Sequence, residues 1–244
     1  MSSANFSAPR DERAPDAGSS LLGDSKRWMK EVGIPLFIPP EGRAALTHLN
    51  IFSVTTLLIE LQRLSTLGAS WASAALATIL IYPDEQGMRE LARSKELLMK
   101  PAAAGDAYSL YVLAWAELLS GDGSAFFNHM QRSAKAGFSP AILDLAGTFL
   151  PKKVETTLRL LKIAEAKGHL AARGRILQMW MNGSFGWTHR VPGLLWFIYN
   201  YLKTIRKLSL DPLSVHTFCI HNRFPSPPIR RLAVALDRSG STLA

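Results

Sequence analysis

Cysteine is almost absent from this sequence. The 244 residues include a single one, Cys219, so no disulfide can form within the chain. This usage fits a reducing compartment, and we expect a cytoplasmic protein. Long apolar runs are also missing, because the best candidate, Val191–Leu202, falls short of the roughly 20 residues that a membrane-spanning helix needs. We expect that segment to be a buried helix or one lying in a membrane interface.

Acidic residues are scarce in the last third of the chain. The whole sequence has 28 Lys and Arg against 19 Asp and Glu, a formal charge of +9. Between His169 and Ala244 there are ten Lys and Arg, but only Asp211 and Asp237 on the acidic side. Such a balance favours anionic partners. Nucleic acid is not the expected one, because the charges are spread among prolines and apolar residues with no recognised reading motif.

Sequence motifs of catalysis are missing as well. The chain has no phosphate loop, dinucleotide fingerprint, nucleophile elbow or two-histidine zinc motif, so we expect neither an enzyme nor a cofactor. The acidic residues are scattered over different predicted helices, and we expect most to be solvated surface charges. They include Glu60, Glu85, Glu90, Glu96, Asp106, Asp122 and Asp144.

One short segment has the residue types of a metal site. His216, Cys219 and His221 fall within six residues and could supply two imidazoles and a thiolate to zinc. No fourth ligand is evident nearby, and the alternative is that these are packed residues of the C-terminal tail.

Glycine recurs at nearly regular intervals through the middle of the chain. The intervals are 37, 32 and 31 residues along the series Gly68, Gly105, Gly137 and Gly168. A period of roughly 30 to 40 residues is typical of a solenoid built from helix pairs. Glycine also suits the left-handed position that closes a helix. We therefore expect one helix to end at each glycine and the next to begin just after it.

Apolar residues stand at the same offsets after each glycine. Eight positions on are Leu76, Leu113, Leu145 and Ile176, nine on are Ala77, Ala114, Ala146 and Leu177, and thirteen on are Ile81, Leu118, Leu150 and Met181. Offsets separated by four or five residues share one face of a helix. That face is expected to be the packed one. Each unit then closes with an amphipathic second helix, predicted at Met88–Ala104, Ser124–Ala136 and Lys153–Lys167.

These units resemble Sel-one-like repeats, relatives of the tetratricopeptide repeats. The resemblance covers about Gly68 to Gly186 and rests on Gly105-Asp106 with Leu113 and Ala114, Gly121-Asp122-Gly123, and Ala134-Lys135-Ala136-Gly137. In two units the glycine-rich turn is replaced by Pro83-Asp84-Glu85 and Pro151-Lys152. The resemblance implies an all-α solenoid, a right-handed superhelix of antiparallel helix pairs. It also implies adaptor or regulatory work, in bacteria often in signalling, envelope polysaccharide production or host interaction.

Four segments follow from these patterns. Residues 1–26 are predicted to be a disordered arm without the apolar run that a secretory signal needs. Residues 27–67 form an N-terminal capping region, with one helix from about Arg43 to Leu64. Residues 68–208 hold the repeats, and residues 209–244 form a basic, proline-containing tail.

The function expected from this organisation is that of a non-enzymatic scaffold or adaptor for a protein partner. Exposed contacts are predicted on the first helices at Glu117 and Arg175, and aromatic contacts at Trp187 and Trp196. Trp71, Trp115 and Trp180 are expected to pack in the core instead.

Two alternatives stay open. In the first, Gly193–Leu202 with Lys203, Arg206 and Lys207 binds an anionic membrane surface, as in a peripheral accessory protein of envelope or exopolysaccharide production. In the second, the protein is secreted into a host cell, with the N-terminal arm as its export address.

Overall fold

The chain forms an array of helices, seen here in a computed structural model. The structure describes residues 36–46, 54–82, 89–149, 153–182 and 184, with residues 194–196, 198, 199 and 202 of a further helical segment. The helices are α2 (Pro40–Leu46), α3 (Val54–Thr66), α4 (Ser70–Leu80), α5 (Leu91–Ala103), α6 (Ala107–Leu119), α7 (Gly123–Lys135), α8 (Ser139–Phe149), α9 (Val154–Ala166) and α10 (Leu170–Met181). None of the described residues lies in a strand. The predicted all-α class is confirmed.

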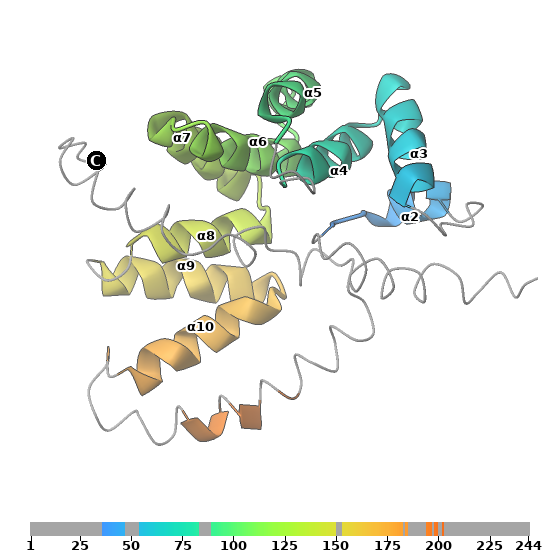
Figure 1. Cartoon of the computed structure of the whole chain (residues 1–244). Coiled ribbons are helices and arrows are strands. Elements are labelled where there is room, and N and C mark those ends of the chain that lie inside the picture. Colours follow the sequence, from blue (N-terminus) through green and yellow to red (C-terminus); the bar gives the residue numbers. More distant parts are fainter. Residues whose placement is uncertain are drawn as a thin grey trace, which may run out of the picture.

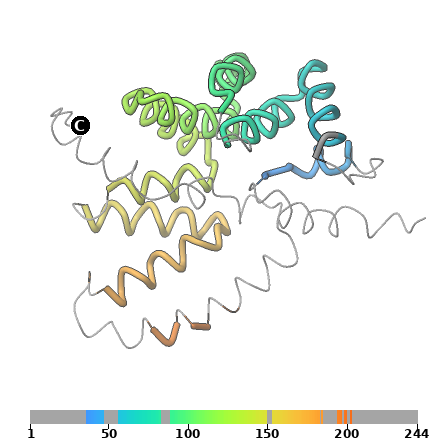
Figure 2. The backbone as a smooth tube through the Cα atoms, in the orientation of Figure 1, coloured from blue at the N-terminus to red at the C-terminus, as the bar shows by residue number. Residues whose placement is uncertain are grey.

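Helices that follow one another along the chain pack against one another. Each helix from α3 onward contacts the next, up to α9 with α10, and α4 also contacts α6 directly. First helices α4, α6, α8 and α10 thus alternate with second helices α5, α7 and α9. Figure 1 shows α4 to α7 in the upper part of the array and α8 to α10 stacked below them, and in Figure 2 the tube steps down from α7 to α8. This neighbour-to-neighbour packing confirms the predicted solenoid.

Glycines in the left-handed region close the turns between helices. Five of them, Gly68, Gly105, Gly121, Gly137 and Gly168, have φ between 85° and 91°. At the second of these turns, the Gly105 amide donates to the Ala102 carbonyl (3.1 Å) and the Asp106 amide to the Pro101 carbonyl (3.0 Å). The same two bonds close the other four turns, which makes each a Schellman motif. The four turn glycines predicted from the period are confirmed, and so is the predicted turn at Gly121-Asp122-Gly123.

The residue after the glycine starts the next helix in two of these turns. The Asp106 carboxylate accepts a hydrogen bond from the Ser109 amide at 2.7 Å, and Asp122 accepts one from the Ala125 amide at 2.9 Å. Both are N-caps. The bond from Ala125, followed by one from the Ser124 hydroxyl, lowers the pKa of Asp122. In these two turns, a left-handed glycine ends one helix and the capping residue that follows it stands directly before the next.

The residues predicted for the packed face are buried. All eight described side chains at the first two offsets are buried, as are Ile81 and Leu118 at the third, while Met181 is half-buried. Leu150 lies outside the described residues. Trp115 is also buried and meets Phe126 edge-on at 5.8 Å between ring centroids. Trp71 and Trp180 are half-buried and pack at the edges of the core.

The described residues of the N-terminal cap form two helices. The single helix predicted from about Arg43 to Leu64 is wrong, because α2 ends at Leu46 and α3 starts at Val54 and points in another direction (Figure 1). Leu46 of α2 and Leu61 of α3 both join the apolar cluster that α4 completes. The change of direction between α2 and α3 lets both helices contribute to the same cluster.

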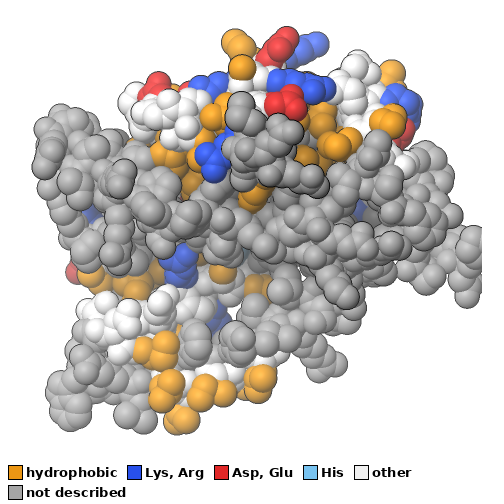
Figure 3. All heavy atoms as spheres, viewed as in Figure 1, with side chains coloured by type: hydrophobic (Ala, Val, Ile, Leu, Met, Phe, Trp, Pro, Cys, Tyr) orange, Lys and Arg blue, Asp and Glu red, His pale blue; other side chains and the backbone are white. Residues whose placement is uncertain are grey.

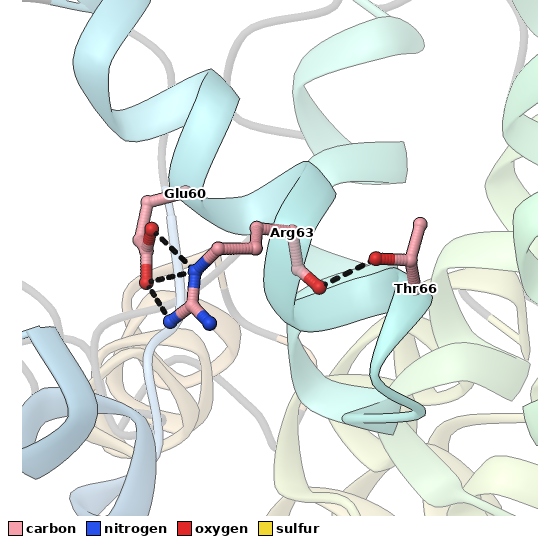
Figure 4. Close-up of polar contacts among 3 residues, drawn as sticks. All are labelled: Glu60, Arg63 and Thr66. Atoms are coloured by element: carbon pink, nitrogen blue, oxygen red, sulfur yellow. Dashed lines mark hydrogen bonds and ion pairs between the residues drawn. The ribbon is translucent and has the colours of Figure 1, made fainter.

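Two acidic residues expected at the solvated surface are buried. Glu60 is 8% exposed and binds Arg63, whose Nε donates to both carboxylate oxygens at 3.0 and 2.9 Å (Figure 4). This bond raises the pKa of the Arg63 guanidinium. Asp144 is 6% exposed and accepts a hydrogen bond from the Tyr111 hydroxyl at 2.7 Å. Both carboxylates are tolerated inside because each accepts hydrogen bonds. The donor to Glu60 lies three residues on in the same helix, a spacing that can be read from sequence. The donor to Asp144 lies on another helix, so local sequence does not reveal it.

Candidate functional site

Four aromatic side chains from three parts of the chain meet on the first helices. Phe37 precedes α2, Tyr108 and Tyr111 lie on α6, and Phe138 stands directly before α8. We call this group the aromatic cluster. The Phe37 ring meets Tyr108 edge-on at 5.0 Å and Phe138 at 5.9 Å, while Phe138 lies 5.6 Å from Tyr108 and 5.2 Å from Tyr111. These separations are the favourable range for aromatic pairs.

Polar atoms of the aromatic cluster bind the neighbouring first helices. The Tyr108 hydroxyl lies 3.1 Å from the Thr78 hydroxyl of α4, and the Tyr111 hydroxyl donates to Asp144 of α8. Burial raises the pKa of Tyr108, although hydrogen bonds with Thr78 and with the backbone of Phe37 act in the opposite direction. Both tyrosines therefore hold α6 against its neighbours and fix the shape of the surface that Phe37 contacts.

Phe37 reaches this surface on a short extended segment, Leu36–Pro39. Leu36 and Ile38 are each 2% exposed and belong to the apolar cluster of α2 to α4. Phe37, between them, packs against the separate cluster centred on α6. Alternation of this kind is expected of extended backbone. Figure 1 shows the segment running beneath α4, on the side away from α5.

The predicted partner contacts on the first helices are less exposed than expected. The exposure assigned to Glu117 is wrong: its side chain is 18% exposed, and its Oε2 atom lies 2.6 Å from the Lys95 Nζ atom. This ion pair joins α6 to α5. Arg175, on α10, is half-buried. The structure therefore gives Glu117 a role inside the array.

Trp196 is exposed, as its predicted role requires. It is 47% exposed, its ring meets Tyr199 edge-on at 5.9 Å, and the Arg173 guanidinium of α10 lies 5.2 Å from its ring centroid. The other predicted contacts lie outside the described residues, namely Trp187, Lys203, Arg206 and Lys207. The possible metal ligands His216, Cys219 and His221 lie there too.

The aromatic cluster was not predicted from the sequence: none of its four residues was among the expected partner contacts. One local signal was present, because Leu36-Phe37-Ile38 stands between Pro35 and Pro39. A residue before proline favours extended backbone. An apolar tripeptide between prolines therefore indicates an extended segment whose side chains are buried against other elements. The surface that it meets depends on long-range packing.

Among the described residues, no helix is both long and apolar enough to cross a membrane. Comparison with known proteins gives no matching family model, no matching curated protein and no matching solved structure. The resemblance to Sel-one-like repeats therefore stays a prediction.

Proposed function

We propose that this protein is a non-enzymatic scaffold or adaptor whose first helices bind an extended segment of a partner protein. The observation that supports this is the seating of Phe37 in the aromatic cluster. Stacked helix pairs offer a long surface that accepts extended chains. Here such a chain is already in place, since Leu36–Pro39 crosses from the N-terminal cap to α6 and α8.

The chemistry of the partner follows from this segment. Phe37 fills an aromatic surface, and its backbone hydrogen-bonds Tyr108. A partner with an aromatic side chain between aliphatic residues, followed by proline, has the same shape and polarity. Such a segment carries little conformational entropy to lose, because proline restricts it before binding. The segment Leu36–Pro39 then acts as an internal competitor that a partner must displace.

Competition between the internal segment and a peptide tests the proposal. The probe is a synthetic peptide with the sequence of residues 34–40, labelled for fluorescence anisotropy and titrated with the full chain. Phe37→Ala empties the aromatic surface without altering Tyr108, Tyr111 or Phe138. We expect this variant to bind the peptide about tenfold more tightly than the native chain, as for a buried aromatic anchor.

Two controls separate recognition from loss of structure. A peptide with alanine at the position of Phe37 should not bind. The double variant Phe37→Ala with Tyr108→Ala should bind the native peptide no more tightly than the native chain does. Thermal unfolding of both variants shows whether the array remains folded. If folded Phe37→Ala does not bind the peptide, the proposed binding surface is wrong.

A further inference from the structure

Large apolar side chains are exposed together at one end of the array. Among the described residues, ten large apolar side chains are at least 41% exposed, and six of these ten belong to residues 194–202. They are Leu194, Leu195, Trp196, Ile198, Tyr199 and Leu202, with exposed fractions from 47% to 65%. Figure 3 shows apolar side chains gathered along the lower edge of the molecule, where Figure 1 places this segment below α10. We call the group the terminal apolar face.

The geometry of a helix gathers most of this group on one side. At about 100° per residue, Leu194, Leu195, Ile198, Tyr199 and Leu202 fall within an arc of about 140°. Trp196 lies beyond that arc, where Arg173 of α10 contacts its ring. The Arg173 guanidinium also lies 3.5 Å from Glu165 of α9. Trp196 thus attaches the segment to the array while the apolar arc points away from it.

Residues 194–196, 198, 199 and 202 are the last helical residues that the structure describes, and none of the described helices covers their apolar arc. The outer face of a terminal helix in a repeat array is normally polar. Exposed apolar patches of this kind mark a contact with another surface. The question is therefore which surface covers residues 194–202.

Charge distinguishes between the candidates. No Asp or Glu occurs between Glu165 and Asp211, whereas this stretch holds Lys167, Arg173, Arg175, Arg190, Lys203, Arg206 and Lys207. A second copy of the chain would bring the same positive charge against the face, which disfavours self-association. An anionic surface is favoured instead. Trp and Tyr beside aliphatic residues, with Lys and Arg close by in sequence, are typical of a helix in a lipid interface.

We infer that the terminal apolar face docks the array on an anionic lipid bilayer. The segment lies flat, with its apolar arc among the acyl chains, and the Lys and Arg that are close by in sequence supply the attraction to the anionic phosphates. This contact is independent of the aromatic cluster, which consists of Phe37, Tyr108 and Tyr111 of α6, and Phe138 directly before α8. The protein would then present its partner-binding surface at a membrane.

Vesicle flotation tests the inference. The full chain is mixed either with phosphatidylcholine vesicles containing about one third phosphatidylserine or with phosphatidylcholine alone, and then centrifuged through a density gradient. We expect flotation with the anionic vesicles only, and release at high salt because the phosphates are screened. Leu195→Asp should reduce the bound fraction about tenfold, since it places a charge in the apolar arc.

Ile59→Asp is the matched control. Ile59 and Leu195 are both 65% exposed, but Ile59 lies on α3, at the other end of the array. This variant should float like the native chain, and so should Phe37→Ala if it is folded. Circular dichroism and thermal unfolding verify that Leu195→Asp keeps the native fold.

Three results would overturn the inference. The native chain stays at the bottom with both kinds of vesicle, or Leu195→Asp floats as well as the native chain. In the third, the native chain elutes as a dimer, fails to float, and becomes monomeric on Leu195→Asp, so that a second copy covers the face. Failure of flotation leaves the peptide experiment unaffected, because the two use different variants and different surfaces.

Discussion

Single residues at the turns determine where each helix of this array stops. Gly105 is representative: its φ is 85°, and a Cβ built on it meets no atom within 4 Å. Lack of space for a side chain is therefore not the reason for glycine at this position. The reason is the backbone conformation, because a residue with a side chain in the left-handed region costs roughly 1 to 2 kcal/mol.

Replacing glycines inside and outside the turns separates conformation from packing. Gly105→Ala should lower the free energy of unfolding by about 1 to 2 kcal/mol, measured by urea denaturation. Gly174, inside α10, also has no atom within 4 Å of an added Cβ. Gly174→Ala should therefore raise the free energy of unfolding, by up to about 1 kcal/mol. Equal effects of the same sign would contradict the role of the left-handed turn.

Within a helix pair, local sequence signals determine where each helix begins and ends. The predicted second helices Ser124–Ala136 and Lys153–Lys167 correspond to α7 (Gly123–Lys135) and α9 (Val154–Ala166). This agreement has a physical cause, because an amphipathic repeat and a glycine C-cap both act within one helix. Contacts that depend on how two helices are placed against each other were not predicted. Glu117 is such a case, since its partner Lys95 lies on another helix.

The Lys95–Glu117 ion pair should be measurable in the stability of the array. A double-mutant cycle with Lys95→Met and Glu117→Gln should give a coupling energy of about 1 kcal/mol, the upper end for partly exposed pairs. Glu96→Gln is the matched control, because Glu96 is an exposed residue of α5. That substitution should leave the free energy of unfolding nearly unchanged. A coupling energy near zero would show that the pair does not join α5 to α6.

At the scale of the whole molecule, stability is distributed along the array. Three apolar clusters follow one another: the first spans α2 to α4, the second is centred on α6, and the third joins α8 to α10. Helix α6 is buried along nearly all of its length. The order of the clusters could be predicted from the glycine period. The bridge from Phe37 to Phe138 could not, because no local pattern links residues so far apart in sequence.

Hydrogen exchange should show this gradient. Amides of α6 are expected to exchange most slowly, with protection falling toward α3 on one side and α10 on the other, since terminal repeats have fewer neighbours. Mass spectrometry of peptic fragments resolves these helices. Uniform protection from α3 to α10 would instead indicate a single cooperative unit.

The segment Leu36–Pro39 also has a mechanical consequence. A stack of helix pairs behaves as a spring, whose curvature changes when small rotations between neighbouring pairs add up. Phe37 contacts both Tyr108 of α6 and Phe138 directly before α8, so it resists rotation of α6 against α8. We therefore expect the array to be stiffer while Phe37 occupies this position. Displacement of Phe37 should allow α6 and α8 to rotate against each other and the curvature of the array to change.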